Sequence, residues 1–182
     1  MTRIGIGYDA HPFAKDRRLM IGGIEVPFHL GLAGHSDADV LLHAICDALL
    51  GAIAEGDLGS FYPDTDARYR DIESIRFLEE VYERVVRKGY RLVNLDAVLI
   101  AEQPRLASYL PGMRETIAKV LKVKDREISI KVKSNERMGF IGRGEGIAAQ
   151  AVCALEKHEK LEKYEKNEKD EKKVRKRRWK RS

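Results

Sequence analysis

The sequence is poor in cysteine and has no long apolar run. Its 182 residues include two cysteines, Cys46 and Cys153, both among small and apolar neighbours in patterns typical of helices. This setting favours small buried side chains in a reducing cytoplasm over a disulfide. No stretch of about 18 apolar residues could span a bilayer, and the amino-terminal segment lacks the apolar run of a signal peptide. We therefore expect a soluble, cytoplasmic protein whose core forms without disulfides or a membrane.

The excess of basic residues lies at one end of the chain. Residues 157–182 contain 13 lysines and arginines against 6 acidic residues, whereas residues 1–156 contain 21 against 23. From 156 to 173 the chain repeats Glu-Lys-x, and each Glu–Lys pair four residues apart stabilises a helix by about 0.2–0.5 kcal/mol. We predict one domain over 1–156, then a charged tail over 157–182 that extends the last helix or is disordered. The basic end could touch nucleic acid, but a solubilising tail is the simpler interpretation.

Strand-like and helix-like patterns alternate along the first 156 residues. Apolar spacing predicts a helix from Asp37, with Ser36 as its N-cap and an end near Gly56. The other expected elements are a strand at 3–8, a hairpin at 19–26, helices at 71–88, from 111 and at 147–155, and strands at 91–101 and 127–133. This order predicts an α/β or α+β sandwich with the sheet covered on one face.

Asp9, His11 and His43 are the candidate metal ligands. Residues two apart on a strand point the same way, so Asp9 and His11 can converge on one ion. His43 lies in the predicted helix with Asp39 and Asp47 one turn away, and either carboxylate could orient its second ring nitrogen. Three protein ligands with an open position are typical of catalytic zinc, but the same ligand types serve iron-dependent oxygenases.

The surrounding motifs favour phosphate chemistry over oxygen chemistry. His35 and Ser36 lie where a loop meets a predicted helix N-terminus, which attracts anions. Ser134 precedes a glycine-rich loop, and Glu136 offers the hard oxygen that magnesium prefers. The acidic loop at 57–66 could bind ribose hydroxyls, although such loops are often ordinary turns.

Five motifs occur in an order that resembles one enzyme family. They are Gly7-Tyr8-Asp9-Ala10-His11, Gly34-His35-Ser36-Asp37-Ala38-Asp39-Val40 with His43, Gly56-Asp57-Leu58-Gly59, Phe61-Tyr62-Pro63-Asp64-Thr65-Asp66, and Gly139-Phe140-Ile141-Gly142-Arg143-Gly144-Glu145-Gly146. Over about residues 1–156 the chain is similar to the 2-C-methyl-D-erythritol 2,4-cyclodiphosphate synthases of the non-mevalonate isoprenoid pathway.

The resemblance implies a lyase that converts 4-diphosphocytidyl-2-C-methyl-D-erythritol 2-phosphate into the cyclic diphosphate and CMP. It implies a small mixed four-stranded sheet with helices on one face, a short hairpin, and a homotrimer with active sites between subunits. It also implies zinc on Asp9, His11 and His43, and magnesium or manganese on Glu136 with the substrate phosphates. Membranes and nucleic acids are not expected partners.

The same resemblance assigns roles to residues. His35 and Ser134 are the expected catalytic donors. The expected substrate-binding residues are Asp9, His11, His35, Ser36, Asp57, Gly59, Tyr62, Asp64, Asp66, Ala101, Pro104, Arg105, Leu106, Ala107, Lys133, Ser134, Asn135, Glu136, Phe140 and Arg143.

Overall fold

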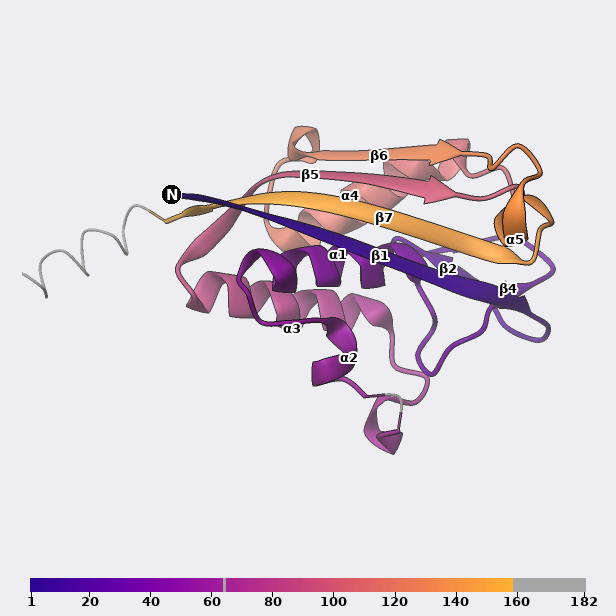
Figure 1. Ribbon diagram of the computed structural model, residues 1–182, viewed down its shortest axis with the longest axis horizontal. Helices are drawn as coiled ribbons and strands as arrows, with labels where there is room; N and C mark the ends of the chain where they lie inside the picture. Colours follow the sequence, from indigo (N-terminus) through magenta and orange to yellow (C-terminus); the bar gives the residue numbers. More distant parts are fainter. Residues whose placement is uncertain (64, 159–182) are drawn as a thin grey trace, which may run out of the picture.

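The computed structural model describes residues 1–63 and 65–158, in which a five-stranded mixed sheet carries its helices on one face (Figure 1). The strands are β1 (Thr2–Ala14), β2 (Leu19–Ile21), β3 (Ile24–Val26), β4 (Gly31–Leu32), β5 (Tyr90–Ile100), β6 (Ile128–Lys133) and β7 (Gly146–Lys157). The α-helices are α1 (Val40–Ala52), α2 (Leu58–Phe61), α3 (Ser74–Arg87), α4 (Leu110–Leu121) and α5 (Gly139–Gly142). Short 3₁₀ turns occupy Ala67–Tyr69, Ala107–Tyr109 and Asp125–Glu127.

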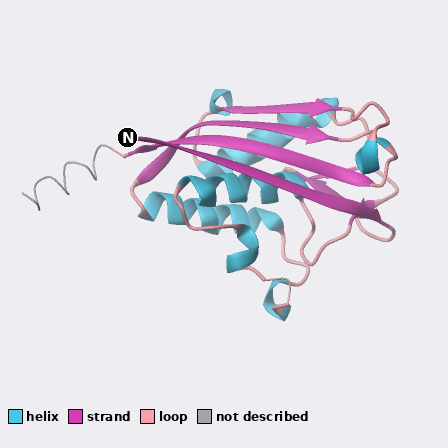
Figure 2. Cartoon of the chain, viewed as in Figure 1, coloured by secondary structure: helices cyan, strands magenta, loops and turns pink. Residues whose placement is uncertain are grey.

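The strand order in the sheet is β4-β1-β7-β5-β6, and β2 pairs with β3 as a separate hairpin. β7 lies at the centre, antiparallel to both β1 and β5, while β5 and β6 run parallel. The predicted hairpin and sandwich are confirmed, but the prediction of four strands is wrong because the two-residue β4 adds to the edge of β1. Figure 2 shows the long strands above α1 and α3, while α4 lies behind the sheet in this view.

The predicted helix at 147–155 is wrong, because these residues form β7. Ala148, Ala149 and Ala151 are fully or almost fully buried in this central strand. Alanine favours helices in isolation, but here the small side chains of Ala149 and Ala151, which pair with Asp9 and Gly7, let α1 pack against the strand. A tail that extends a last helix therefore has no helix to extend; residues 159–182, which make up nearly all of the predicted tail, lie outside the described part of the chain.

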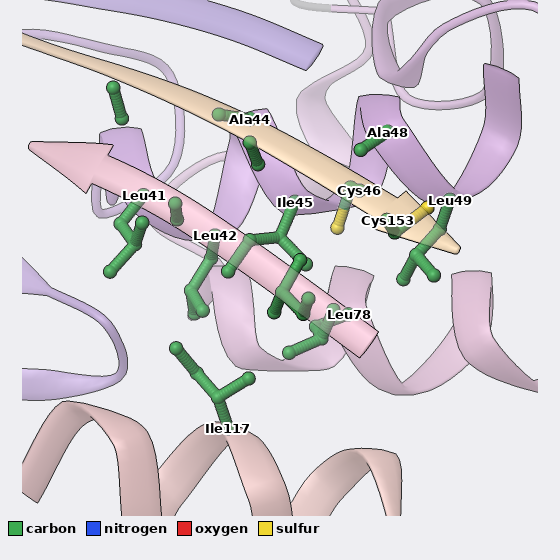
Figure 3. Close-up of a cluster of buried hydrophobic side chains, with 14 of the residues drawn as sticks. Leu41, Leu42, Ala44, Ile45, Cys46, Ala48, Leu49, Leu78, Ile117 and Cys153 are labelled. Carbon is green, nitrogen blue, oxygen red and sulfur yellow. The ribbon is translucent and has the colours of Figure 1, made fainter. Parts of the chain in front are cut away.

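The core fills the space between the inner sheet face and the helices. Figure 3 shows Leu42, Ile45 and Leu49 of α1 gathered with Leu78 of α3 and Ile117 of α4. All five side chains are inaccessible to solvent. Both cysteines are buried and free in this core, as predicted, although Cys153 comes from a strand. In the described ranges no helix combines the length and apolar character that a membrane crossing requires.

The outer face of the sheet is exposed and apolar where Ile4 to Tyr8 of β1 pair with β7. Ile4, Ile6 and Tyr8 of β1 are 63%, 62% and 54% exposed, and Val152 of β7 beside them is 40% exposed. We call these four residues the outer sheet face. Large apolar side chains grouped in this way are typical of a protein interface.

Candidate metal centre

Two glycines of β1 allow this strand to pack closely against α1. A Cβ atom on Gly7 would lie 2.0 Å from the carbonyl oxygen of Ala44, and one on Gly5 would lie 1.8 Å from that of Ala48. Only glycine permits so close an approach between the strand and α1. His43 precedes Ala44 in α1, so this approach places its imidazole beside the strand that carries Asp9 and His11.

The three predicted ligands converge on one point. The Oδ2 atom of Asp9 lies 2.8 Å from Nε2 of His11 and 2.9 Å from Nδ1 of His43, and the two nitrogens are 3.1 Å apart. In a tetrahedral zinc site with bonds of about 2.0–2.2 Å, neighbouring ligand atoms lie about 3.3–3.6 Å apart. The observed separations are within about half an ångström of that arrangement, and these are the only His, Cys, Asp or Glu side chains in the described residues that group so closely.

The imidazole rings of His11 and His43 each form a hydrogen bond through the nitrogen that faces away from Asp9. The other ring nitrogen, which faces Asp9, is left available to a cation. Nδ1 of His11 lies 2.7 Å from the carbonyl oxygen of Ala33 and can only donate to it, which leaves Nε2 without a proton when the ring is neutral. Nε2 of His43 lies 2.9 Å from the hydroxyl of Ser74, which in turn donates to Asp37. The donor set of one carboxylate and two imidazole nitrogens therefore fits a divalent metal.

Without a cation, the acidic and basic ligands stabilise each other's charge. Burial alone would raise the pKa of Asp9, but hydrogen bonds from His11 and His43 and their charges hold it well below its usual value. Burial alone would lower the pKa of His11, but the hydrogen bond and charge of Asp9 raise it above 6.5. Asp9 is thus an anion at neutral pH, as a metal ligand must be.

Neither carboxylate that was predicted to orient His43 does so. Asp39 is fully buried and caps α1, accepting from the backbone N–H groups of Leu42, Gly22 and Gly23. Asp47 accepts from the backbone N–H of Leu58 at 2.8 Å. Because Asp39 is the cap, the helix begins at Val40 and the predicted N-cap Ser36 is wrong.

A cavity of about 540 Å³ opens above the three ligands. Its lining brings together the predicted residues Asp9, His11, His35, Ser36, Gly59 and Tyr62, together with His43, Asp47, Tyr69 and Phe77. The Nε2 atom of His35 lies 3.1 Å from the backbone oxygen of Asp66, and the Tyr62 hydroxyl donates to Glu80 at 2.7 Å. Asp64 lies outside the described residues. Asp57 is exposed and accepts from Ser60, so in this arrangement it caps α2.

The second group of predicted residues lies in another part of the fold. Among the described residues, the lining of this cavity includes none from 101–107 or 133–136. Those segments follow the carboxyl ends of β5 and β6, which are separated from β1 by β7. The Ser134 hydroxyl donates to Glu136, and the same loop is bound by Glu102, whose Oε1 accepts from the N–H groups of Asn135 and Arg137 at 3.0 Å each. Further along the chain, Phe140 is 44% exposed and Arg143 pairs with Glu145 at 2.6 Å.

Sequence reasoning missed Ser74, Asp37 and Glu102. Ser74 opens α3, 31 residues after His43, and no spacing in the sequence connects the two. Asp37 stood within a recognised motif, but its partner is again distant. The only signal for Glu102 was its place between the predicted substrate-binding residues Ala101 and Pro104.

Comparison with known proteins shows to which family a chain with these metal ligands belongs. The family model described as the YgbB family matches residues 2–156. The chain belongs to the YgbB family. Its curated relatives include the 2-C-methyl-D-erythritol 2,4-cyclodiphosphate synthases of Halalkalibacterium halodurans, 51% identical over 86% of this chain and 100% of the relative, and of Moorella thermoacetica, 54% identical over 86% and 96%.

Solved structures of YgbB-family relatives share the fold. The bifunctional IspDF of Campylobacter jejuni matches with a TM-score of 0.84 and 36% identity, over 86% of this chain and 42% of that one. A 2C-methyl-D-erythritol-2,4-cyclodiphosphate synthase in a CDP-bound form matches with a TM-score of 0.78 and 32% identity, over 85% and 100%. The resemblance seen in the sequence motifs is confirmed.

Proposed function

We propose that this chain is a 2-C-methyl-D-erythritol 2,4-cyclodiphosphate synthase. The observation that carries the proposal is the convergence of Asp9, His11 and His43 beneath an open cavity. It occurs in a chain that is 51% identical to a curated synthase along the whole length of that relative. The curated relatives named above are synthases, which favours phosphoryl transfer over an oxygenase with the same donors.

The reaction is an intramolecular phosphoryl transfer. An oxygen of the substrate's 2-phosphate forms a bond to the β-phosphorus of the cytidine diphosphate group. The bond from that phosphorus to the bridging oxygen breaks, and the electron pair leaves with CMP. No water enters, so the enzyme is a lyase. Because the nucleophile is already an anion at neutral pH, the pocket needs no strong general base.

Asp9, His11 and His43 would hold zinc, and Glu136 would hold magnesium or manganese with the substrate phosphates. When bound, such cations supply positive charge that polarises phosphate oxygens and reduces repulsion between phosphates. The chain's own donors act beside them: His35 and Ser134 would donate hydrogen bonds to phosphate oxygens as charge shifts. Ser134 is already within bonding distance of Glu136.

The remaining residues would fold the substrate for ring closure. Residues 101–107 would hold the cytidine, residues 57–66 the erythritol and ribose, and residues 133–136 the phosphates, with Phe140 and Arg143 completing the pocket. Relatives solved with CDP support a nucleotide subsite in this fold. Well-oriented closure can remove roughly 7–11 kcal/mol of barrier, so positioning contributes more than acid–base chemistry.

A homotrimer would complete the site. The metal cavity and the 101–107 and 133–136 segments lie on different parts of one subunit, so one subunit's cavity would face its neighbour's nucleotide segments. The outer sheet face, with Ile6 62% exposed, offers the apolar contact surface that such an assembly needs.

The test is incubation with the cytidyl-diphosphate substrate, zinc and magnesium, followed by phosphorus NMR. The expected products are CMP and a cyclic diphosphate, formed anaerobically and without incorporation of oxygen from labelled water. A His43→Ala variant should form neither product and should bind no zinc. Oxygen-dependent turnover, or a linear product formed with water, would contradict the proposal.

A further inference from the structure

His43 is supported from behind by a buried chain of hydrogen bonds. Its Nε2 atom lies 2.9 Å from the Ser74 hydroxyl, and Ser74 is wholly inaccessible to solvent. That hydroxyl donates to Oδ1 of Asp37, while the backbone N–H of Ser74 donates to Oδ2 at 3.1 Å. We call Ser74 and Asp37 the His43 support. It links the start of α3 to the loop before α1.

The direction of these bonds follows from the number of protons available. A serine hydroxyl has one proton, and the Asp37 carboxylate can only accept it. The oxygen of Ser74 is then left as an acceptor, so Nε2 of His43 must carry the ring proton of the neutral imidazole. Nδ1, which lies 2.9 Å from Asp9, therefore presents its lone pair to the metal position.

We propose that Ser74 and Asp37 are positioning residues for the metal centre. They fix the orientation of the His43 ring and hold its ring proton on Nε2, and the negative charge of Asp37, relayed through the hydroxyl, makes Nδ1 a stronger ligand. This inference rests on the proposed function, because it assumes that the three ligands bind a divalent cation. Partners of this kind typically change metal affinity about 10–100-fold.

A neighbouring serine provides a matched control. The Ser36 hydroxyl lies 3.3 Å from the same nitrogen and 3.3 Å from the Ser74 hydroxyl, and it is also buried. It accepts a backbone proton from Ala38 and has no carboxylate behind it. Ser36→Ala and Ser74→Ala therefore remove the same group from the same cluster, but only the second interrupts the support.

The test measures zinc affinity by competition with a chromophoric chelator, using the full-length protein. We expect Ser74→Ala to weaken zinc binding about 10–100-fold, Asp37→Asn to weaken it less, and Ser36→Ala to change it less than about threefold. The cobalt(II) absorption spectrum, which reports ligand geometry, should change in Ser74→Ala and not in Ser36→Ala. Thermal unfolding of the metal-free proteins checks that each variant is folded; should Ser74→Ala not fold, Asp37→Asn carries the same comparison.

Three outcomes would overturn the inference, and only the third also overturns the proposed metal centre. Unchanged zinc affinity and an unchanged cobalt spectrum in Ser74→Ala and Asp37→Asn would overturn the role of the His43 support and leave the metal centre standing. Equal losses in Ser36→Ala and Ser74→Ala would also overturn it, because disturbed packing of the cluster would then be the cause. If the unsubstituted protein binds no zinc, the proposed metal centre itself fails, and the inference fails with it.

Discussion

Replacing Gly7 with alanine should damage both stability and metal binding. The added Cβ would lie 2.0 Å from the Ala44 oxygen and 2.7 Å from the Ala48 nitrogen, where real contacts are at least 3.0 Å. Because protein interiors are close-packed, α1 would have to move away from β1 by about 1 Å. Both contacts are with backbone atoms, so no side-chain rotation can relieve the clash.

The magnitude has two parts. Overpacking of this kind costs about 1–3 kcal/mol of unfolding free energy, which lowers Tm by about 2–4 °C per kcal/mol in a chain of this size. A displacement of about 1 Å is also half the length of a zinc–nitrogen bond of about 2.0–2.1 Å. We therefore expect zinc affinity to fall at least about tenfold and turnover about 100-fold, as small misplacements of catalytic groups do.

Gly51→Ala is the matched control. Gly51 lies in α1, and a Cβ there would meet only the Ile6 oxygen at 3.8 Å, an ordinary contact. Alanine is favoured over glycine within a helix by roughly 0.5–1 kcal/mol, so this variant should be slightly more stable. Denaturant unfolding at fixed protein concentration and zinc competition would measure both variants. Gly7→Ala with unchanged zinc affinity would refute the claim that close packing of α1 places His43.

Four further predictions rest on the described contacts. Glu102→Ala leaves the N–H groups of Asn135 and Arg137 without their acceptor. Hydrogen bonds to charged groups contribute about 1.5–3 kcal/mol, so activation by magnesium should require about tenfold more of the cation. A fall in zinc affinity in place of this change would contradict the prediction. Burial lowers the pKa of His11, but Asp9 raises it above 6.5, so zinc must displace a proton and its measured affinity should fall as the pH is lowered through that pKa. In the metal-free protein, the contribution of the raised His11 pKa to the free energy of unfolding is fully present below pH 6.5 and is lost as the pH rises through that pKa. Melting curves measured at several pH values would detect this loss. Ile6→Glu places a charge on the outer sheet face and should give monomers by light scattering with loss of turnover; an intact, active trimer would count against the proposed assembly.

The sequence predicted most elements but not the central strand. Residues 147–155 are apolar nearly throughout, and such a run does not distinguish a buried strand from a buried helix. Alanine at 148, 149 and 151 favoured the helix, whereas tertiary packing against α1 decided for the strand. The alternation around Asp9 and His11, by contrast, was unambiguous and predicted their convergence correctly.

The convergence of Asp9 and His11 was predictable because they lie two residues apart on one strand. The residues that support His43 were not predictable, because their contacts are distant in sequence. Asp9 and His11 share one strand, so two residues of sequence fix their common direction. Ser74 meets His43 only after α3 has packed beside α1, and Asp39 caps its helix while also holding the hairpin glycines. Local capping rules favoured Ser36 over Asp39, because they do not include a contact with that hairpin.

The pairing of β1 with β7 places the two ends of the domain side by side. Thr2 faces Glu156, and the Lys157 N–H donates to the Met1 oxygen at 3.4 Å. Seven residues of extended strand, about 23 Å, separate this edge from Asp9. A fused domain or an added peptide at either terminus would therefore leave the sheet about seven strand residues away from the three proposed metal ligands.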